Sequence, residues 1–77
     1  MTDWEHLGSA EAVRREVQAA LPMGSTAEEI VSFTTAARLR HTRTDGVIHA
    51  EAAGGWTIRF HVPRGALTRL DIDRAAT

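Results

Sequence analysis

The fold of this chain is decided by the stretch Trp56-Thr57-Ile58-Arg59-Phe60-His61-Val62. Large apolar residues occupy every second position of it, and polar residues occupy the positions between them. Strict alternation of this kind is typical of a β-strand that has one face on a core and the other in water. The stretch also contains one of the two Trp and one of the two Phe residues of the chain. We therefore expect it to be a central strand of a sheet.

Length and composition indicate one small globular domain. The chain has 77 residues, a formal net charge of −1 and no Cys, so neither disulfides nor thiolate-bound zinc can stabilise it. A domain of this size buries only about 60% of the surface of its unfolded chain, so its margin of stability is small. We expect an N-terminal lead over residues 1–8, a domain over 9–73 and a tail over 74–77. Within the lead, Trp4 and Leu7 are candidates to dock on the domain.

The sequence lacks the signals that direct a chain to or across a membrane. Its first residues have neither the basic start nor the apolar run of a signal peptide, and no stretch of about 20 apolar residues occurs. We therefore expect a cytoplasmic protein without a membrane segment. The alternative, a mature secreted domain that begins behind an added Met1, stays open.

The first helix is expected over residues 10–20. Ser9 fits the position of an N-cap, and Val13 and Val17 recur on one face at helical spacing. Pro22 ends the helix, because the residue before a proline avoids the helical backbone conformation.

The second helix is expected over residues 26–36. Ser25 or Thr26 is its N-cap, and Ser25 with Glu28 fits the Ser-x-x-Glu pattern of a capping box. The expected apolar stripe of this helix consists of Ile30, Phe33 and Ala37, with Ala27 and Thr34 beside them.

From Ala37 onward the period of the pattern changes to two. Four strands are expected, over residues 38–43, 47–52, 56–62 and 66–73. Asp45-Gly46 between the first two favours a two-residue hairpin loop in a type I′ turn. The sequence therefore predicts an α+β fold, with two N-terminal helices packed on one face of a four-stranded antiparallel meander sheet.

The turns predict the register of the strands. A two-residue loop places Arg40 opposite Glu51, and a three-residue loop over 53–55 places His49 beside Arg59. A three-residue loop over 63–65 would place Arg59 beside Arg69 and Thr57 beside Asp71. Apolar and polar residues stay on separate faces in this register, as a one-sided sheet requires.

The face of the sheet that is turned away from the helices is expected to be polar. It would carry Arg40, Val47, His49, Glu51, Thr57, Arg59, His61, Leu67, Arg69 and Asp71. One interpretation is a solvated face on which Glu51 and Asp71 balance the arginines. The other is a binding surface for an acidic or carboxylate-rich partner protein. The candidate partner-binding residues are Arg40, His49, Arg59, His61, Arg69 and Asp71.

The sequence gives little reason to expect catalysis or metal binding. His6, His41, His49 and His61 match no standard zinc spacing, and His41 would point to the opposite side of the sheet from His49 and His61. No Gly-rich phosphate loop precedes a helix. We therefore expect no enzyme, no cofactor and no metal site.

A local basic cluster suggests a second class of function. Arg38, Arg40 and Arg43, together with His41, lie close in sequence at the start of the sheet. Such a cluster is one element of a nucleic-acid site, but these sites usually also expose aromatic side chains. We therefore keep a small nucleic-acid-associated regulator as the alternative function.

The segment from Leu21 to Ile30, which contains Pro22-Met23-Gly24-Ser25 and Glu28-Glu29, resembles the "Pro-x-Gly-Ser-x-x-Glu-Val" entry to the second helix of SmpA/BamE-like lipoprotein domains. The segment from Trp56 to Asp73 is similar to their closing hairpin, and β-lactamase-inhibitor proteins repeat the same unit. The resemblance covers about residues 10–73 and implies a binding module, either an envelope assembly scaffold or an enzyme inhibitor. This chain lacks their signal peptide and lipobox Cys.

The function that these features favour is non-catalytic protein–protein binding, as an adaptor, an inhibitor or an immunity-type protein. The partner would bind to the polar sheet face or to an exposed sheet edge. Homodimerisation through the sheet is a third possibility, because the core is small.

Overall fold

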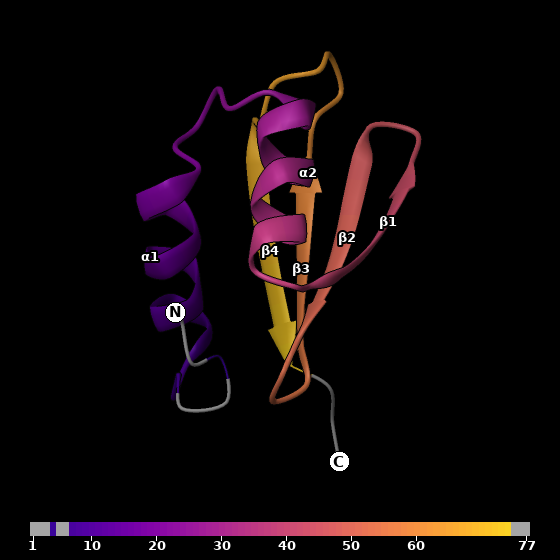
Figure 1. Cartoon of the computed structure of the whole chain (residues 1–77). Helices are drawn as coiled ribbons and strands as arrows, with labels where there is room; N and C mark the ends of the chain where they lie inside the picture. Colours follow the sequence, from indigo (N-terminus) through magenta and orange to yellow (C-terminus); the bar gives the residue numbers. More distant parts are fainter. Residues whose placement is uncertain (1–3, 5–6, 75–77) are drawn as a thin grey trace.

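The computed structural model describes residue 4 and residues 7–74, and it has two helices on one face of a four-stranded antiparallel sheet (Figure 1). In chain order the elements are α1 (Ala10–Ala20), α2 (Ala27–Ala36), β1 (Arg40–Thr44), β2 (Val47–Ala52), β3 (Trp56–His61) and β4 (Arg69–Arg74). The strands lie side by side in the order β1-β2-β3-β4. The predicted α+β meander is therefore confirmed.

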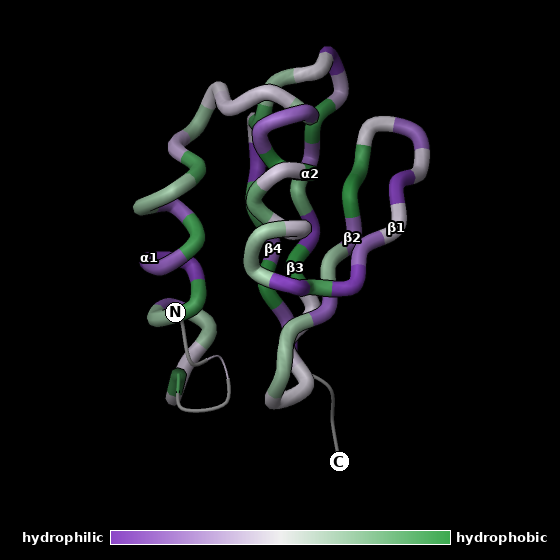
Figure 2. The backbone as a smooth tube through the Cα atoms, in the orientation of Figure 1, coloured by the Kyte–Doolittle hydropathy of each residue, from purple (hydrophilic) through white to green (hydrophobic). Residues whose placement is uncertain are grey.

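Apolar and polar residues alternate along β3, and the apolar ones lie in the core as the sequence predicted. Trp56, Ile58 and Phe60 are buried, whereas the residues between them are half-buried. The helices cover this apolar face with Val13, Val17, Ala27 and Ile30, all of which are buried. Figure 2 shows the contrast with β1, which is hydrophilic along its length.

The N-terminal segment contributes to the same core. Trp4 is buried and meets the ring of Phe33 edge-on, with 6.4 Å between the ring centroids. The indole N–H of Trp56 donates to the carbonyl oxygen of Trp4 over 3.1 Å. Leu7 also packs against the core, so both candidate docking residues of the lead lie on the domain. The expectations for residues 1–3, 5, 6 and 75–77 lie outside the described residues.

Both helices begin at side-chain caps. The Ser9 hydroxyl accepts a hydrogen bond from the N–H of Ala12, as expected. The capping box of α2 is formed by Thr26 and Glu29, each of which accepts from the backbone N–H of the other. The predicted pairing of Ser25 with Glu28 is wrong, since the buried Ser25 hydroxyl donates to the carbonyl of Pro22 instead.

The β1–β2 hairpin has the predicted register, with Arg40 opposite Glu51. Its turn differs from the prediction. Gly46 has a φ of +67°, but Asp45 does not have a positive φ. A type I′ turn needs positive φ at both central residues, so the turn at Asp45-Gly46 is not of this type.

The register between β3 and β4 differs from the prediction by two residues. Arg59 lies opposite Asp71 rather than Arg69, and Thr57 lies opposite Asp73. A shift of two preserves which face each side chain occupies, so apolar and polar residues stay separated.

The cause of the shift is a second pairing partner for the segment before β4. The N–H of Leu67 donates to the carbonyl of Ser25, and the carbonyl of Leu67 accepts from Gly24, both over 2.8 Å. Thr26 and Ala66 form an isolated bridge beside these bonds. This pairing keeps the segment out of β4, which begins at Arg69, and turns Leu67 into the core. The expectation that Leu67 lies on the polar face is therefore wrong.

The chain leaves α2 through an arginine in the left-handed backbone conformation. Arg38 has a φ of +58°. Its N–H donates to the carbonyl of Thr35, and the N–H of Leu39 donates to that of Thr34. These are the two hydrogen bonds of a Schellman motif, whose left-handed position is usually occupied by glycine.

Replacement of Arg38 by glycine is expected to stabilise the fold. A left-handed conformation costs a residue with a Cβ atom about 1 kcal/mol, and glycine avoids this cost. We predict that Arg38→Gly raises the free energy of unfolding by about 1 kcal/mol in urea denaturation at neutral pH. Arg40→Gly, in an extended strand, is the matched control and should lower it. A loss of stability in Arg38→Gly would contradict this account of the helix end.

Candidate functional site

The sheet face that is turned away from the helices is polar, but its charges on β3 and β4 are paired. Arg59 forms an ion pair with Asp73. Nε of Arg69 lies 3.1 Å from one carboxylate oxygen of Asp71, and Nε2 of His61 lies 2.8 Å from the other. Arg59, His61 and Arg69 therefore already have carboxylate partners within the chain.

Asp71 is the centre of this network, and its pKa reflects that position. Partial burial of the carboxylate is the largest single effect and raises the pKa. The hydrogen bonds from His61 and Arg69, together with the charges of both side chains, lower it by more. The pKa of Asp71 therefore lies below its ordinary value of 3.8.

The lowered pKa predicts an acid-sensitive contribution to stability. A carboxylate with a lower pKa in the folded state stabilises the fold fully above its unfolded pKa, near 3.9, and loses this effect as the pH falls through the folded pKa. Asp71→Asn should therefore lower the free energy of unfolding above about pH 5, and the difference from wild type should shrink below about pH 4. Urea denaturation across this range is the measurement.

The matched control for this prediction is Asp45→Asn. Asp45 is an exposed carboxylate at the hairpin turn and makes no ion pair within residues 7–74. Its substitution should change stability little at either pH. A difference between wild type and Asp71→Asn that stays constant down to about pH 2 would contradict the role of the Asp71 carboxylate.

Strand β1 is an open edge of the sheet. All five of its residues are exposed, and β2 is the one strand that pairs with it among residues 7–74. Figure 1 shows the β1–β2 hairpin standing to one side of α2. An edge strand of this kind presents unpaired N–H and C=O groups to any extended chain that aligns with it.

The hydrogen bonding of β2 shows which amides of β1 point outward. The carbonyl of Gly46 accepts from Val62, so this position faces β3. Because backbone groups alternate in direction along an antiparallel strand, Val47, His49 and Glu51 face β1 instead. Their register partners on β1 are Thr44, Thr42 and Arg40. The amide groups of His41 and Arg43 therefore point away from the sheet.

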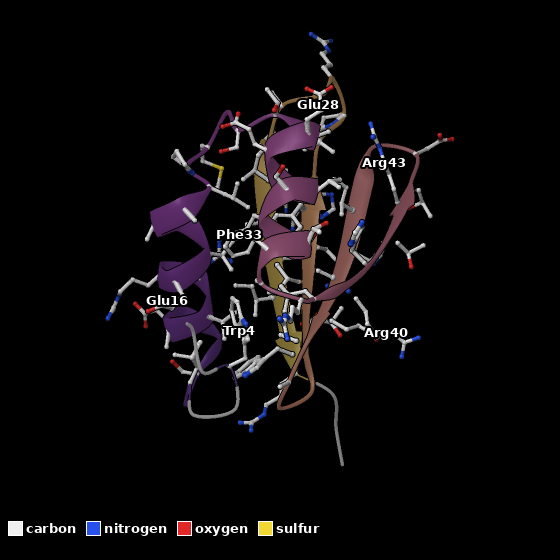
Figure 3. The ribbon with its side chains drawn as sticks, viewed as in Figure 1. Trp4, Glu16, Glu28, Phe33, Arg40 and Arg43 are labelled. Atoms are coloured by element: carbon white, nitrogen blue, oxygen red, sulfur yellow. The ribbon has the colours of Figure 1, made fainter. Side chains whose placement is uncertain are left out.

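Three arginines surround this edge without a partner in the part of the chain that the structure describes. Arg38, Arg40 and Arg43 are exposed and make no ion pair or side-chain hydrogen bond there. Glu51 lies opposite Arg40 in the register, yet the two side chains are not paired. Figure 3 shows Arg40 extending away from the sheet and Arg43 near the hairpin turn. The edge is therefore locally basic in a chain whose net charge is close to zero.

The structure separates the predicted partner-binding residues into two places. Arg59, His61, Arg69 and Asp71 gather on β3 and β4, whereas Arg40 lies on the opposite edge strand. His49, on β2, lies between them and lines a shallow hollow of about 240 Å³. The other lining residues of the hollow are Arg40, His41, Thr42 and Glu51.

The sequence favours solvated or arginine-paired carboxylates at Asp71 and Asp73, but it did not identify Arg59 as the partner of Asp73. The signal was present, because Asp73 follows Asp71 by two residues on one strand and so shares its face. His41 does lie on the helix side, as expected, with its Nδ1 at 3.3 Å from Oγ1 of Thr34 on α2.

The described residues contain no group of three or more His, Cys, Asp or Glu side chains that could hold a metal ion. His6 lies outside them. No helix within residues 7–74 is long and apolar enough to cross a membrane.

Comparison of the chain with models of protein families, with curated proteins and with solved structures finds no match. The resemblance to SmpA/BamE-like domains therefore stays a prediction from the sequence.

Proposed function

We propose that this chain is a non-catalytic protein-binding module that takes an extended segment of a partner protein onto β1 as a fifth strand. The observation that carries the proposal is the exposed edge strand, whose outward amides at His41 and Arg43 face no strand of the described sheet. Strand addition of this kind derives affinity from main-chain hydrogen bonds and specificity from side chains at alternate positions.

The β1 edge is a better candidate for the binding site than the polar sheet face. On the face, Arg59, His61 and Arg69 are bonded to Asp71 and Asp73, so a partner carboxylate would have to displace an existing pair. At the β1 edge, Arg40 and Arg43 have no ion pair within residues 7–74 that a partner would have to displace. The hollow at His49 has a mainly polar lining, unlike the enclosed apolar pocket of a typical small-molecule site, and this supports a macromolecular partner. The binding role implied by the SmpA/BamE-like resemblance agrees with this choice.

A library of random dodecapeptides displayed on phage tests the proposal. We expect selection against the folded protein to enrich peptides that slow hydrogen exchange of the His41 and Arg43 amides, as measured by NMR. Arg43→Pro removes one outward N–H at a position where an edge strand tolerates proline. It should weaken binding of the selected peptides about tenfold or more, since it removes a main-chain hydrogen bond and a charge.

Two variants of the sheet face serve as matched controls. Arg59→Gln and Arg69→Gln remove arginines of the sheet face that lie on β3 and β4, away from β1. Both variants should bind the selected peptides like wild type. Loss of binding in these variants, with retention in Arg43→Pro, would transfer the site to the sheet face. Failure to enrich any peptide that protects His41 and Arg43 would overturn the proposal.

The alternative of a nucleic-acid regulator is supported by the unpaired cluster of Arg38, Arg40 and Arg43. The aromatic side chains weigh against it, because stacking platforms must be exposed. Trp4, Trp56 and Phe60 are buried, and Phe33 is half-buried against Trp4. No Trp or Phe ring of the described chain is therefore exposed beside these arginines.

We accordingly predict no measurable binding of a mixed single-stranded oligonucleotide pool by fluorescence anisotropy at about 50 mM salt. Binding that is lost steeply by about 200 mM salt, and that is abolished in Arg38→Ala/Arg40→Ala/Arg43→Ala, would replace the protein-binding proposal with the nucleic-acid one.

A further inference from the structure

We infer that the partner segment carries two acidic residues three positions apart, so that one faces Arg40 and the other faces Arg43. This inference rests on the proposed function, because it assumes that the segment aligns with β1. It specifies the chemistry of the partner, which open backbone groups alone do not determine.

The spacing follows from the geometry of β1. Successive side chains of a strand point to opposite faces, so Arg40 lies on the open face of the sheet and Arg43 on the helix side. Three residues of a strand span about 10 Å. In a strand paired with β1, the residue opposite each arginine shares its face and has a Cβ atom about 5 Å away. A segment of the form acid-x-x-acid therefore meets both arginines, one on each face.

The sign of the partner's charge follows from the residues around the edge. Arg40 and Arg43 have no partner among the described residues. The nearest acidic side chain in the register, Glu51, leaves Arg40 unpaired. Opposite charges that face each other across strands are stabilising, and like charges are destabilising. The edge therefore favours an acidic segment over a neutral or basic one.

The same charges disfavour a second copy of this chain as the occupant. The sequence of β1 is Arg-His-Thr-Arg-Thr and contains no acidic residue. A copy that paired its own β1 with β1 would bring only basic or neutral side chains toward the arginines. The other edge strand, β4, carries Asp71 and Asp73, but both already pair with side chains of their own chain. Charged residues on edge strands commonly prevent self-association in this way. The occupant is therefore a different chain with complementary charge.

Synthetic nonapeptides with a Thr/Val background test the inference. One peptide carries Glu-x-x-Glu. A second has the same composition but Glu-x-Glu, which places both acids on one face, and a third has Gln in place of both Glu. We expect the first to bind wild-type protein about two- to tenfold more tightly than the other two at low salt, in isothermal calorimetry. The difference should shrink as salt is added.

Loss of peptide binding alone could also result from a change of fold, so a charge swap is the sharper test. Arg40→Glu/Arg43→Glu should reject the Glu-x-x-Glu peptide and prefer a matched Arg-x-x-Arg peptide. Both substituted positions are exposed, and the circular dichroism spectrum should stay that of the wild type. Recovery of binding by the swapped pair would establish that the two side chains, and not a change of fold, select the peptide.

The possible failures are distinct. Peptides that protect the His41 and Arg43 amides with equal affinity, whatever their acids, would overturn the inference and leave the edge proposal intact. If no peptide, including those from the displayed library, protects these amides, both are overturned. Light scattering could instead show a homodimer whose β1 amides are already protected from hydrogen exchange. That result would overturn both the inference and the edge proposal, because a second copy would occupy the edge.

Discussion

The N–H of Leu67 donates to the carbonyl of Ser25, and its C=O accepts from the N–H of Gly24, so both groups bond to the connector between α1 and α2. These bonds fix α2 against the segment that leads into β4, and they delay the start of β4 to Arg69. The delay determines which β4 residues oppose β3, so that Asp71 and Asp73 come within reach of His61 and Arg59. The electrostatics of the sheet face thus follow from one contact between a helix connector and a loop. A face that looks rich in free arginines becomes an internally neutralised one.

At the opposite edge of the sheet, the arginines around β1 have no carboxylate partner among the described residues. The Schellman motif at the end of α2 turns the chain through Arg38 and delivers it into β1. An arginine at this left-handed position is strained relative to glycine, and local strain is often retained where a side chain is needed. The turn also places β1 at the edge of the sheet, where every side chain is exposed. The sheet therefore has two surfaces with different chemistry. Its charges are paired on β3 and β4, whereas the arginines around β1 have no partner among the described residues.

Most of the fold was predictable because it is encoded locally. The alternation in Trp56–His61 and the two-residue loop at Asp45-Gly46 each fix structure within a few residues. The errors arose where distant segments compete. Ser25 and Thr26 both fit a capping box, and tertiary pairing with Leu67 occupies the carbonyl of Ser25. Alternation alone assigned Leu67 to the polar face, because nothing local shows that its backbone pairs with the helix connector. The candidate residues were identifiable from the sequence, but their pairing depended on this non-local register.

An exposed edge strand creates a general hazard, because it can pair with any extended chain, including another copy of itself. Lysine and arginine on the edge reduce self-pairing, since they set like charges against one another. β1 has this protection in Arg40 and Arg43, and neither is neutralised by a described neighbour. The same two charges that hinder a second copy are favourable for an acidic strand. In the proposed binding mode, protection against aggregation and selection of a partner depend on the same two arginines of the most exposed strand.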